Sequence, residues 1–225
     1  FCRNDCLYCG LRRSNAQLAR YRLSEEQIVD ACRAGHAAGF RTFVLQGGED
    51  PALDDGRIER LLRRLRADFP DSALTLSLGE RSALTYRRWR EAGADRYLLR
   101  HEAADAACYA RLHPPEMSQQ RRLACLDTLR DLGYQTGAGM MVGAPGQGVA
   151  DLVADLSYLE RFRPEMVGIG PYLPQQQTPL AGSPSGSAAR TLLLLSMVRL
   201  MLPDALLPAT TALASLLMDG RERGI

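Results

Sequence analysis

Short apolar runs rich in β-forming residues alternate with longer amphipathic stretches along most of the chain. The apolar runs predict strands, and in order they are "RTFVLQGG", "ALTLSLG", "DRYLLRHE", "TGAGMMVG", "EMVGIGPYLP" and, as a last candidate, "ALLPATTAL". The stretches between them predict helices, because leucines recur at helical spacing with arginines on the other face, as in "RIERLLRRLRADF". The alternation predicts six parallel strands joined by right-handed crossovers.

This alternation favours two α/β architectures. A (β/α)8 TIM-type barrel of one domain over residues 1–225, truncated at both ends, is the simplest fit, and an open doubly wound sheet comes second. No linker of domain scale interrupts the pattern. In both architectures active sites gather at the carboxyl ends of the strands, so polar residues there are the first candidates.

The composition of the chain argues against several classes of protein and adds nothing further to the predicted fold. The 225 residues are 24% charged with a net charge of +2, which is too small to indicate a nucleic-acid partner. Every basic residue is arginine, so an arginine-rich segment carries little information by itself. The longest apolar run, "TLLLLSMVRLML", is too short to span a bilayer, and no signal peptide is visible. Six cysteines are too few for a disulfide scaffold, so we expect a cytoplasmic protein without a membrane partner.

Polar and glycine residues stand at the predicted carboxyl ends of the first two strands. Gly47, Gly48 and Glu49 follow the first strand, and paired glycines let the backbone approach a ligand closely, although turns also favour glycine. Thr75 and Ser77 lie two residues apart, so they share one face of the second strand.

The third strand has the most charged face. Arg96, Arg100 and Glu102 have the same parity, and His101 has the opposite parity and is expected to face the helices. If the charged face points into a barrel, it needs internal pairing or a ligand, because burying unpaired charge is costly. A structural Arg–Glu network and a ligand site both satisfy that need. Three further cysteines fall on helical patterns and are expected to be buried: Cys32, Cys108 and Cys125.

The chain begins with three closely spaced cysteines. Cys2, Cys6 and Cys9 form C-x3-C-x2-C. A structural zinc site would want a fourth cysteine or histidine nearby, and electron-transfer ferredoxins use four cysteines per cluster. Three cysteines on a [4Fe–4S] cluster would leave one iron without a protein ligand, and an open iron is a place for chemistry.

These motifs resemble the radical S-adenosylmethionine (SAM) superfamily, in which the same cysteine spacing carries an aromatic residue at the position of Tyr8. The run Gly47–Gly48–Glu49 is similar to the second motif of that superfamily. The resemblance implies a [4Fe–4S] cluster whose open iron is chelated by SAM. The reduced cluster would then cleave SAM and generate a 5′-deoxyadenosyl radical inside a barrel that shields it from water.

A closer resemblance is to the HydE-type maturases of [FeFe]-hydrogenase. It runs in order through "CRNDCLYCGLRR", "LQGGEDP", "LSLGE", "AGADRYLLRHE", "LGYQTGAGMMVGAPGQ", "MVGIGPYLP", "TPLA" and "LPATTA". It implies a role in assembling the hydrogenase active-site cluster on a cysteine-bound iron carbonyl/cyanide precursor. The implied partners are this small organometallic or amino-acid-like substrate with a carboxylate, a reductase or ferredoxin as electron donor, and sister maturases.

The same resemblance implies roles for individual residues. The cluster ligands would be Cys2, Cys6 and Cys9, and the SAM-binding residues Tyr8, Gly47, Gly48, Glu49, Ser77, Glu102 and Arg122. Arg121 is adjacent to Arg122, and the choice between them stays open. The substrate cavity would be lined by Gln46, Thr75, Arg96, Arg100, Thr210 and Thr211.

The chain departs from the family pattern in three places. Gly47 stands where Ser is more common, Ala103 stands where Thr is frequent, and "PYLPQQQTPL" replaces the usual "PHPDTPL". The last change removes a histidine and an acid near the cavity mouth. Two other interpretations therefore stay open: a radical enzyme of the biotin synthase and methylornithine synthase group, and a passive iron–sulfur or zinc module without turnover.

Overall fold

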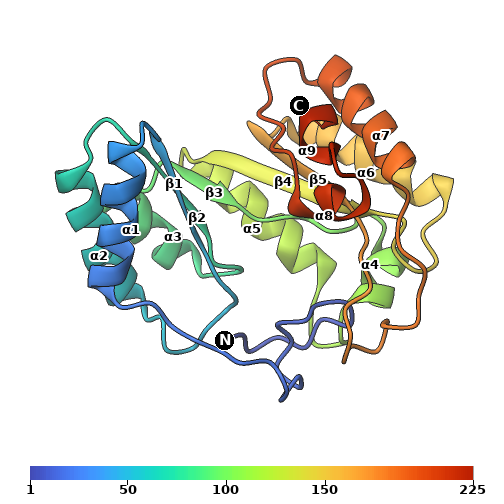
Figure 1. The fold of residues 1–225 in the computed structure, drawn as a ribbon, viewed down its shortest axis with the longest axis horizontal. Helices are drawn as coiled ribbons and strands as arrows, with labels where there is room; N and C mark the ends of the chain where they lie inside the picture. The colour runs from blue at the N-terminus through green and yellow to red at the C-terminus, as the bar shows by residue number, and fades with distance from the viewer. Residues whose placement is uncertain (225) are drawn as a thin grey trace.

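A computed structural model describes residues 1–224 of the chain, which form one parallel sheet with helices around it (Figure 1). The strands are β1 (Thr42–Gln46), β2 (Ala73–Ser77), β3 (Arg96–Leu98), β4 (Gln135–Val142) and β5 (Met166–Pro171). They lie in the order β1-β2-β3-β4-β5, so each strand pairs with its predecessor in sequence. A doubly wound sheet would reverse direction at a switch point. The unidirectional order confirms the curled half of a TIM-type barrel.

Helices before, between and after the strands pack around the sheet, and most of them cover its convex side. They are α1 (Glu25–Ala37), α2 (Asp55–Asp68), α3 (Ala83–Glu91), α4 (Ala106–Leu112), α5 (Gln119–Asp131), α6 (Val149–Phe162), α7 (Ala188–Met201), α8 (Thr211–Leu216) and α9 (Gly220–Arg223). Short polar residues fix several helix starts, and the side chains of Ser24, Asp54 and Ser82 each accept a backbone N–H of the first turn. No helix in residues 1–224 is long and apolar enough to cross a membrane.

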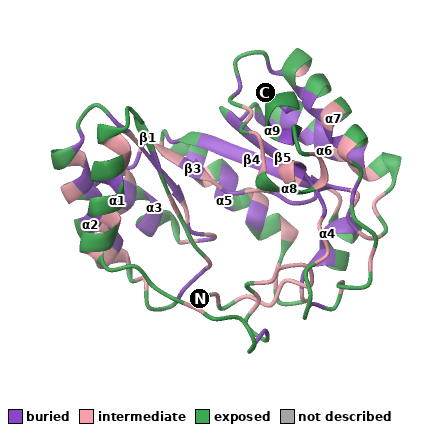
Figure 2. Cartoon of the chain, in the orientation of Figure 1, coloured by how far each residue is buried: buried purple, intermediate pink, exposed green. Residues whose placement is uncertain are grey.

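The two faces of the sheet differ in chemistry. The convex face carries Phe43, Leu74 and Tyr97 into the main hydrophobic core. Residues of the other parity, such as Thr75 and Arg96, are paired across the strands and point to the concave face. Figure 2 shows β4 and β5 buried nearly throughout, whereas the helices are exposed on their outer sides.

Two parity predictions for the third strand are confirmed. His101 is fully buried against Asp155 of α6 on the convex side, whereas Arg100 and Glu102 lie on the concave side and contact each other. The three helical cysteines are also buried as predicted, on α1, α4 and α5.

The prediction of a sixth strand in "ALLPATTAL" is wrong. Only Leu206 makes a strand-like contact, as an isolated bridge to Met166. Pro203 and Pro208 flank this point and have no N–H to extend the ladder. Thr210 is instead the N-cap residue of α8, so it begins a helix rather than ending a strand.

The N-terminal segment lies across the carboxyl ends of the strands. Residues 1–24 contain neither helix nor strand. Figure 1 shows this segment running along the lower edge of the view, from beneath α4 to the start of α1. Leu7 N–H donates to the carbonyl of Leu112 (2.9 Å) and Arg3 N–H to that of Glu49 (3.0 Å). The three cysteines are thus placed at the end of the barrel where active sites form.

Candidate functional site

The three cysteines of the N-terminal segment are free thiols gathered in one partly buried loop. Burial raises the pKa of the Cys6 thiol to about 12, and the charges of the neighbouring Cys9 and Cys2 add to the effect. Such thiols keep their protons unless a cationic centre stabilises the thiolates. Arg122 and Glu102 also act electrostatically on Cys6, so both charged groups lie close to the loop.

This donor set fits a multinuclear cluster better than a single ion. Within the described part of the chain, no three Cys, His, Asp or Glu side chains converge closely enough to hold one metal ion. A structural zinc needs four such donors in one tetrahedron. On an iron–sulfur cluster each cysteine binds a different iron, so three separated thiols in one loop are suitable ligands.

The Gly47–Gly48–Glu49 run contacts the cysteine loop directly. A Cβ atom on Gly48 would lie 2.3 Å from the carbonyl oxygen of Phe1 and 2.7 Å from Cys2 Cβ, so only glycine fits. A Cβ on Gly47 would meet only Leu78, at an ordinary 3.6 Å. The run therefore sets the position of the first predicted cluster ligand.

The carboxylate of Glu49 is buried and fully engaged. It forms an ion pair with Arg3 at 3.0 Å and accepts the backbone N–H of Glu80 at 2.9 Å. A Cβ on Gly79 would lie 2.1 Å from Glu49 Cγ and 2.5 Å from Oε1, so the side chain packs directly on this glycine. Glu49 thus joins the cysteine loop to the loop after β2, and each of its two carboxylate oxygens already has a partner within the protein.

Tyr8 anchors the middle of the cysteine loop. Its ring packs against a small apolar cluster at the carboxyl ends of β4 and β5, formed by Leu112, Met141, Ala144, Tyr172 and Leu180. It also meets His113 edge to face, with ring centroids 5.6 Å apart. Beside it, the Cys6 sulfur lies 3.7 Å from the thioether of Met117, a neighbour that sequence analysis did not identify.

The structure distinguishes the two adjacent arginines. Arg122 is buried, with Nε 2.9 Å from a carboxylate oxygen of Glu80 at an angle too bent for a hydrogen bond. The side chain of Arg121 pairs with the same carboxylate but is 63% exposed. Burial disfavours the charge of Arg122, yet Tyr109 and Glu80 outweigh it and hold its pKa above the usual value. Arg122 is therefore the arginine inside the site.

Glu80 is a site residue that sequence reasoning missed. It is buried, and burial raises its pKa although Arg122 and Arg121 oppose the shift. The only signal was its place directly after a strand, in "LSLGE". Its pairing with Arg122, 42 residues later in the sequence, depends on the fold.

Glu102 and Arg100 present unpartnered polar atoms on the concave face. Glu102 Oε2 lies 3.4 Å from Arg100 Nη2, and neither atom has a hydrogen-bond partner, nor does Arg100 Nε. Buried polar groups are normally satisfied, and buried charge is costly when it is not. These atoms are therefore arranged for a polar ligand that can accept from Arg100 and donate to Glu102.

Two threonines add further unpartnered groups to the concave face. The hydroxyls of Thr75 on β2 and Thr210 before α8 are buried without a hydrogen-bond partner. Thr210 lies over Gly170 of β5, where a Cβ would come within 2.7 Å of the hydroxyl oxygen. Three other predicted residues also border this end of the sheet: Gln46 and Thr211, which are exposed, and Ser77, which is half-buried.

Arg96 is not brought together with Arg100. Arg96 begins β3 and donates to Gln135 at 2.6 Å and to Thr42 at 3.4 Å, at the amino ends of the strands. Arg100 lies four residues further on, just after β3 ends, which is about 13 Å along an extended chain. Arg96 therefore braces the floor of the concave face, and of these two arginines Arg100 is the one with donors that lack hydrogen-bond partners.

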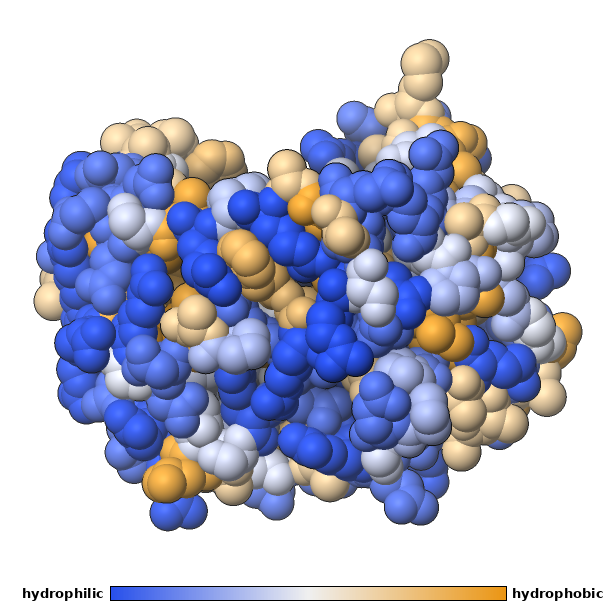
Figure 3. Space-filling view, turned by 90° about the horizontal axis from the view of Figure 1, so that it is seen from below, coloured by the Kyte–Doolittle hydropathy of each residue, from blue (hydrophilic) through white to orange (hydrophobic). Residues whose placement is uncertain are grey.

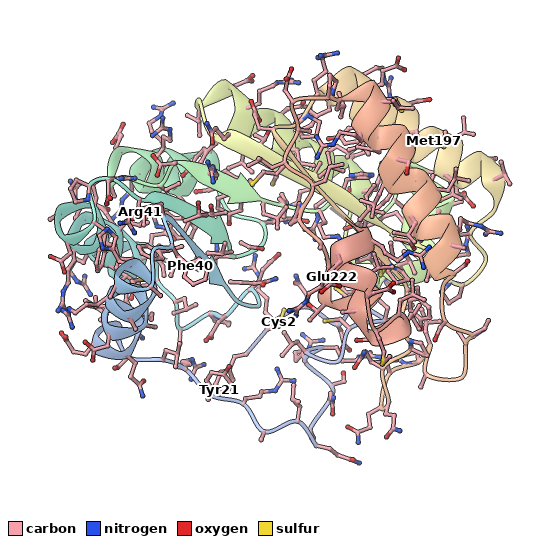
Figure 4. All side chains as sticks on the ribbon, turned by 45° about the horizontal axis from the view of Figure 1, so that its top comes forward. Cys2, Tyr21, Phe40, Arg41, Met197 and Glu222 are labelled. Carbon is pink, nitrogen blue, oxygen red and sulfur yellow. The ribbon has the colours of Figure 1, made fainter. Side chains whose placement is uncertain are left out.

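A cavity lies beside this site rather than in it. It measures about 550 Å³ and lies between α1, β1 and the N-terminal segment, with Tyr21, Phe40 and Val44 among its lining residues. It reaches Gly47 and Gly48 but not Cys6 or Glu102. Figure 4 shows Tyr21 and Phe40 on the α1 side, with Cys2 nearer the middle of the molecule. Seen from the cysteine-loop side, the surface is mostly hydrophilic with scattered apolar patches (Figure 3).

Comparisons with known proteins agree with this geometry. The family model described as the Radical SAM superfamily matches residues 1–159. The chain is 48% identical over 221 residues to the [FeFe] hydrogenase maturase subunit HydE of Thermotoga maritima, covering 98% of this chain and 63% of that protein. It is 29% identical over 212 residues to the 3-methylornithine synthase of Methanosarcina acetivorans, covering 93% and 59%.

A solved structure extends the likeness to three dimensions. The crystal structure of methylornithine synthase (PylB) aligns with a TM-score of 0.89 at 28% identity, covering 100% of this chain and 66% of that one. The chain thus spans less than two thirds of the length of the two curated relatives, at 63% and 59%.

Proposed function

Because the chain belongs to the radical SAM superfamily, we propose that Cys2, Cys6 and Cys9 bind a [4Fe–4S] cluster with one iron left open for SAM. The observation that carries the proposal is the position of three free thiols beside Arg122, which is buried, and Glu102, whose Oε2 has no hydrogen-bond partner. When bound and reduced, the cluster supplies the electron that splits SAM into methionine and a 5′-deoxyadenosyl radical.

The chain's own residues hold and shield the reactants. Glu102 accepts from the amino group of SAM, and Arg122, held by Glu80, donates to its carboxylate. Tyr8, Gly47 and Ser77 border the same site, and Gly48 and Glu49 act by fixing the cysteine loop. The convex core behind the sheet keeps water away from that side of the reaction.

The proposed biological role is assembly of the [FeFe]-hydrogenase active-site cluster in the cytoplasm. It is supported by the 48% identity to a HydE protein over 98% of the chain. The substrate is a cysteine-bound iron carbonyl/cyanide precursor, whose cysteine carboxylate would be held by Arg100 with Thr210 nearby. Arg recognises carboxylates with a planar, two-point fork, and Arg100 has two unpartnered donors. A ferredoxin or reductase would deliver the electron, and sister maturases would supply the precursor.

A second candidate is an enzyme of the methylornithine synthase type. The methylornithine synthase structure matches this chain over 100% of its length with a TM-score of 0.89. An amino-acid substrate also carries a carboxylate, so the Arg100 site suits both candidates.

The first experiment tests radical chemistry itself. The chain is reconstituted anaerobically with iron and sulfide, then incubated with SAM and dithionite, and 5′-deoxyadenosine is quantified. The proposal expects its formation, whereas a passive iron–sulfur or zinc module forms none.

The second experiment separates the two enzyme candidates. This chain replaces the matching segment of the Thermotoga maritima HydE protein, and the chimera is assayed for activation of [FeFe]-hydrogenase. We expect activation. A chimera that forms 5′-deoxyadenosine but leaves the hydrogenase inactive would argue for a different substrate.

A further inference from the structure

Glu102 has an unusual backbone. Its φ is 66°, in the left-handed region that is strained for a residue with a side chain. Such conformations persist where the surrounding structure dictates them, and they gather at functional sites. Beside the cysteine loop, Glu102 Oε2 also has no hydrogen-bond partner, although Arg100 Nη2 lies 3.4 Å away. The contacts around it therefore show what holds the carboxylate in place.

A buried histidine–aspartate pair flanks Glu102 on the convex side. His101 and Asp155 of α6 are both fully buried, with Nε2 3.2 Å from Oδ1. The same Oδ1 accepts the backbone N–H of Ala104 at 2.7 Å. One carboxylate oxygen thus binds the side chain before Glu102 and the backbone two residues after it.

Gly139 of β4 closes the ring of contacts. Its N–H donates to His101 Nδ1 at 3.3 Å, and its carbonyl accepts the N–H of Glu102 at 3.0 Å. Because Nδ1 is an acceptor here, the imidazole proton lies on Nε2 and is donated to Asp155. The backbone of Gly168 packs closely against Gly139, because a Cβ on Gly139 would lie only 2.1 Å from the carbonyl oxygen of Gly168. Gly139 therefore has little room to move.

We propose that His101 and Asp155 are a positioning pair that holds Glu102 in its left-handed conformation and aims its carboxylate at SAM. The proposal rests on the proposed role of Glu102 in binding SAM. A carboxylate buried only for packing would be a poor choice, because Asp155 Oδ2 has no partner and an apolar residue would avoid that cost. The Asp155 carboxylate is useful because it accepts from His101 Nε2 and from the N–H of Ala104, which lie on either side of Glu102 in the sequence.

The proposal predicts a specific kinetic effect. Without Asp155 the turn relaxes, and the Glu102 carboxylate leaves the position in which it meets the amino group of SAM. That contact is made in the bound substrate and in the transition state alike, so its loss raises KM and leaves kcat largely unchanged. A purely structural role would lower the melting temperature without this split.

The experiment uses reconstituted holoprotein and measures the Kd of SAM by calorimetry, together with kcat and KM for 5′-deoxyadenosine formation. Asp155→Ala should raise the Kd about tenfold, a typical effect of losing one charge-assisted contact. Asp155→Asn keeps an acceptor at Oδ1 and should bind SAM within about threefold of the parent. If Asp155→Ala does not yield soluble holoprotein, His101→Leu carries the same test.

Two control variants change buried side chains as Asp155→Ala does, but leave the contacts among His101, Asp155 and Gly139 intact. Tyr158→Phe removes an unpartnered hydroxyl from the same helix, on a ring whose centroid lies 4.8 Å from that of His101. Val198→Ala creates a cavity under α7 and lowers the melting temperature. Both should leave the Kd of SAM unchanged.

Three outcomes are decisive. If Asp155→Ala lowers the melting temperature as Val198→Ala does and binds SAM like the parent, the positioning role is overturned. If Glu102→Ala also binds SAM normally, the proposed SAM role of Glu102 falls with it. If Glu102→Ala weakens binding and Asp155→Ala does not, only the positioning role fails.

Discussion

Replacing Gly48 by alanine should disable cluster binding by displacing the cysteine loop. The new Cβ would lie 2.3 Å from the carbonyl oxygen of Phe1 and 2.7 Å from Cys2 Cβ, whereas real contacts stay beyond 3.0 Å. The loop must retreat by at least about 0.7 Å, and metal–ligand distances tolerate only about 0.2 Å. Overpacking of this kind costs about 1–3 kcal/mol, which disfavours the cluster-binding conformation by about 5- to 150-fold.

Gly47→Ala is the matched control, because its Cβ would meet only Leu78 at 3.6 Å. Both variants are reconstituted anaerobically, and iron and sulfide per chain are measured with the rate of cluster loss to a chelator. We expect Gly47→Ala to retain the cluster as the parent does, and Gly48→Ala to bind it poorly or lose it several-fold faster. Equal iron content and equal loss rates in the two variants would refute the steric argument.

Three further predictions concern single side chains. Arg122→Ala should weaken SAM binding about tenfold or more, the effect of losing a charge-assisted hydrogen bond of about 1.5–3 kcal/mol, while the exposed Arg121→Ala should not; equal affinities by calorimetry would contradict the assignment. Arg100→Lys keeps the charge and loses the two-point fork, so SAM should bind normally while a cysteine analogue binds less well; a crystal soak showing the carboxylate far from residue 100 would count against it. Burial lowers the pKa of His113 from 6.5 to about 4, so the parent should lose up to about 3 kcal/mol of stability as the pH falls through that window. Stability falls because the unfolded chain takes up the proton at a higher pH than the folded chain does. In denaturant titrations of the apo-protein, His113→Gln should therefore lack this dependence of the unfolding free energy on pH. If the parent and the variant gave parallel pH profiles, His113 would not be buried in its neutral form.

The sequence could predict which face of the third strand each site residue occupies. Alternation is local information, so Arg100 and Glu102 could be assigned to one face and His101 to the other before any fold was known. The cysteine spacing was equally local. The parallel pairing of the strands followed from their alternation with helices, whereas the order of the strands, which separates a barrel from a doubly wound sheet, came only from the structure.

The remaining features depend on contacts between distant segments. Glu80 and Arg122 meet because the fold brings the loop after β2 close to the start of α5. The sequence "LSLGE" does not indicate which residue pairs with Glu80. Strand parity correctly predicted that Arg96 lies on the concave face. It did not show that Arg96 lies at the amino end of the strand, away from Arg100, because parity gives the direction of a side chain and not its position along the strand. The last strand was predicted from an apolar run, and Pro208 within it and Pro203 just before it leave only one bridge.

If three cysteines hold a [4Fe–4S] cluster with one iron open to SAM, then SAM must change the magnetic properties of that cluster. Electron paramagnetic resonance of the reduced, reconstituted protein, recorded with and without SAM, measures this change. We expect a [4Fe–4S]⁺ signal that changes when SAM is added, in the parent and in Cys108→Ser, and that is absent from Cys6→Ala. A signal that SAM leaves unchanged, or one that persists in Cys6→Ala and disappears in Cys108→Ser, would contradict this expectation.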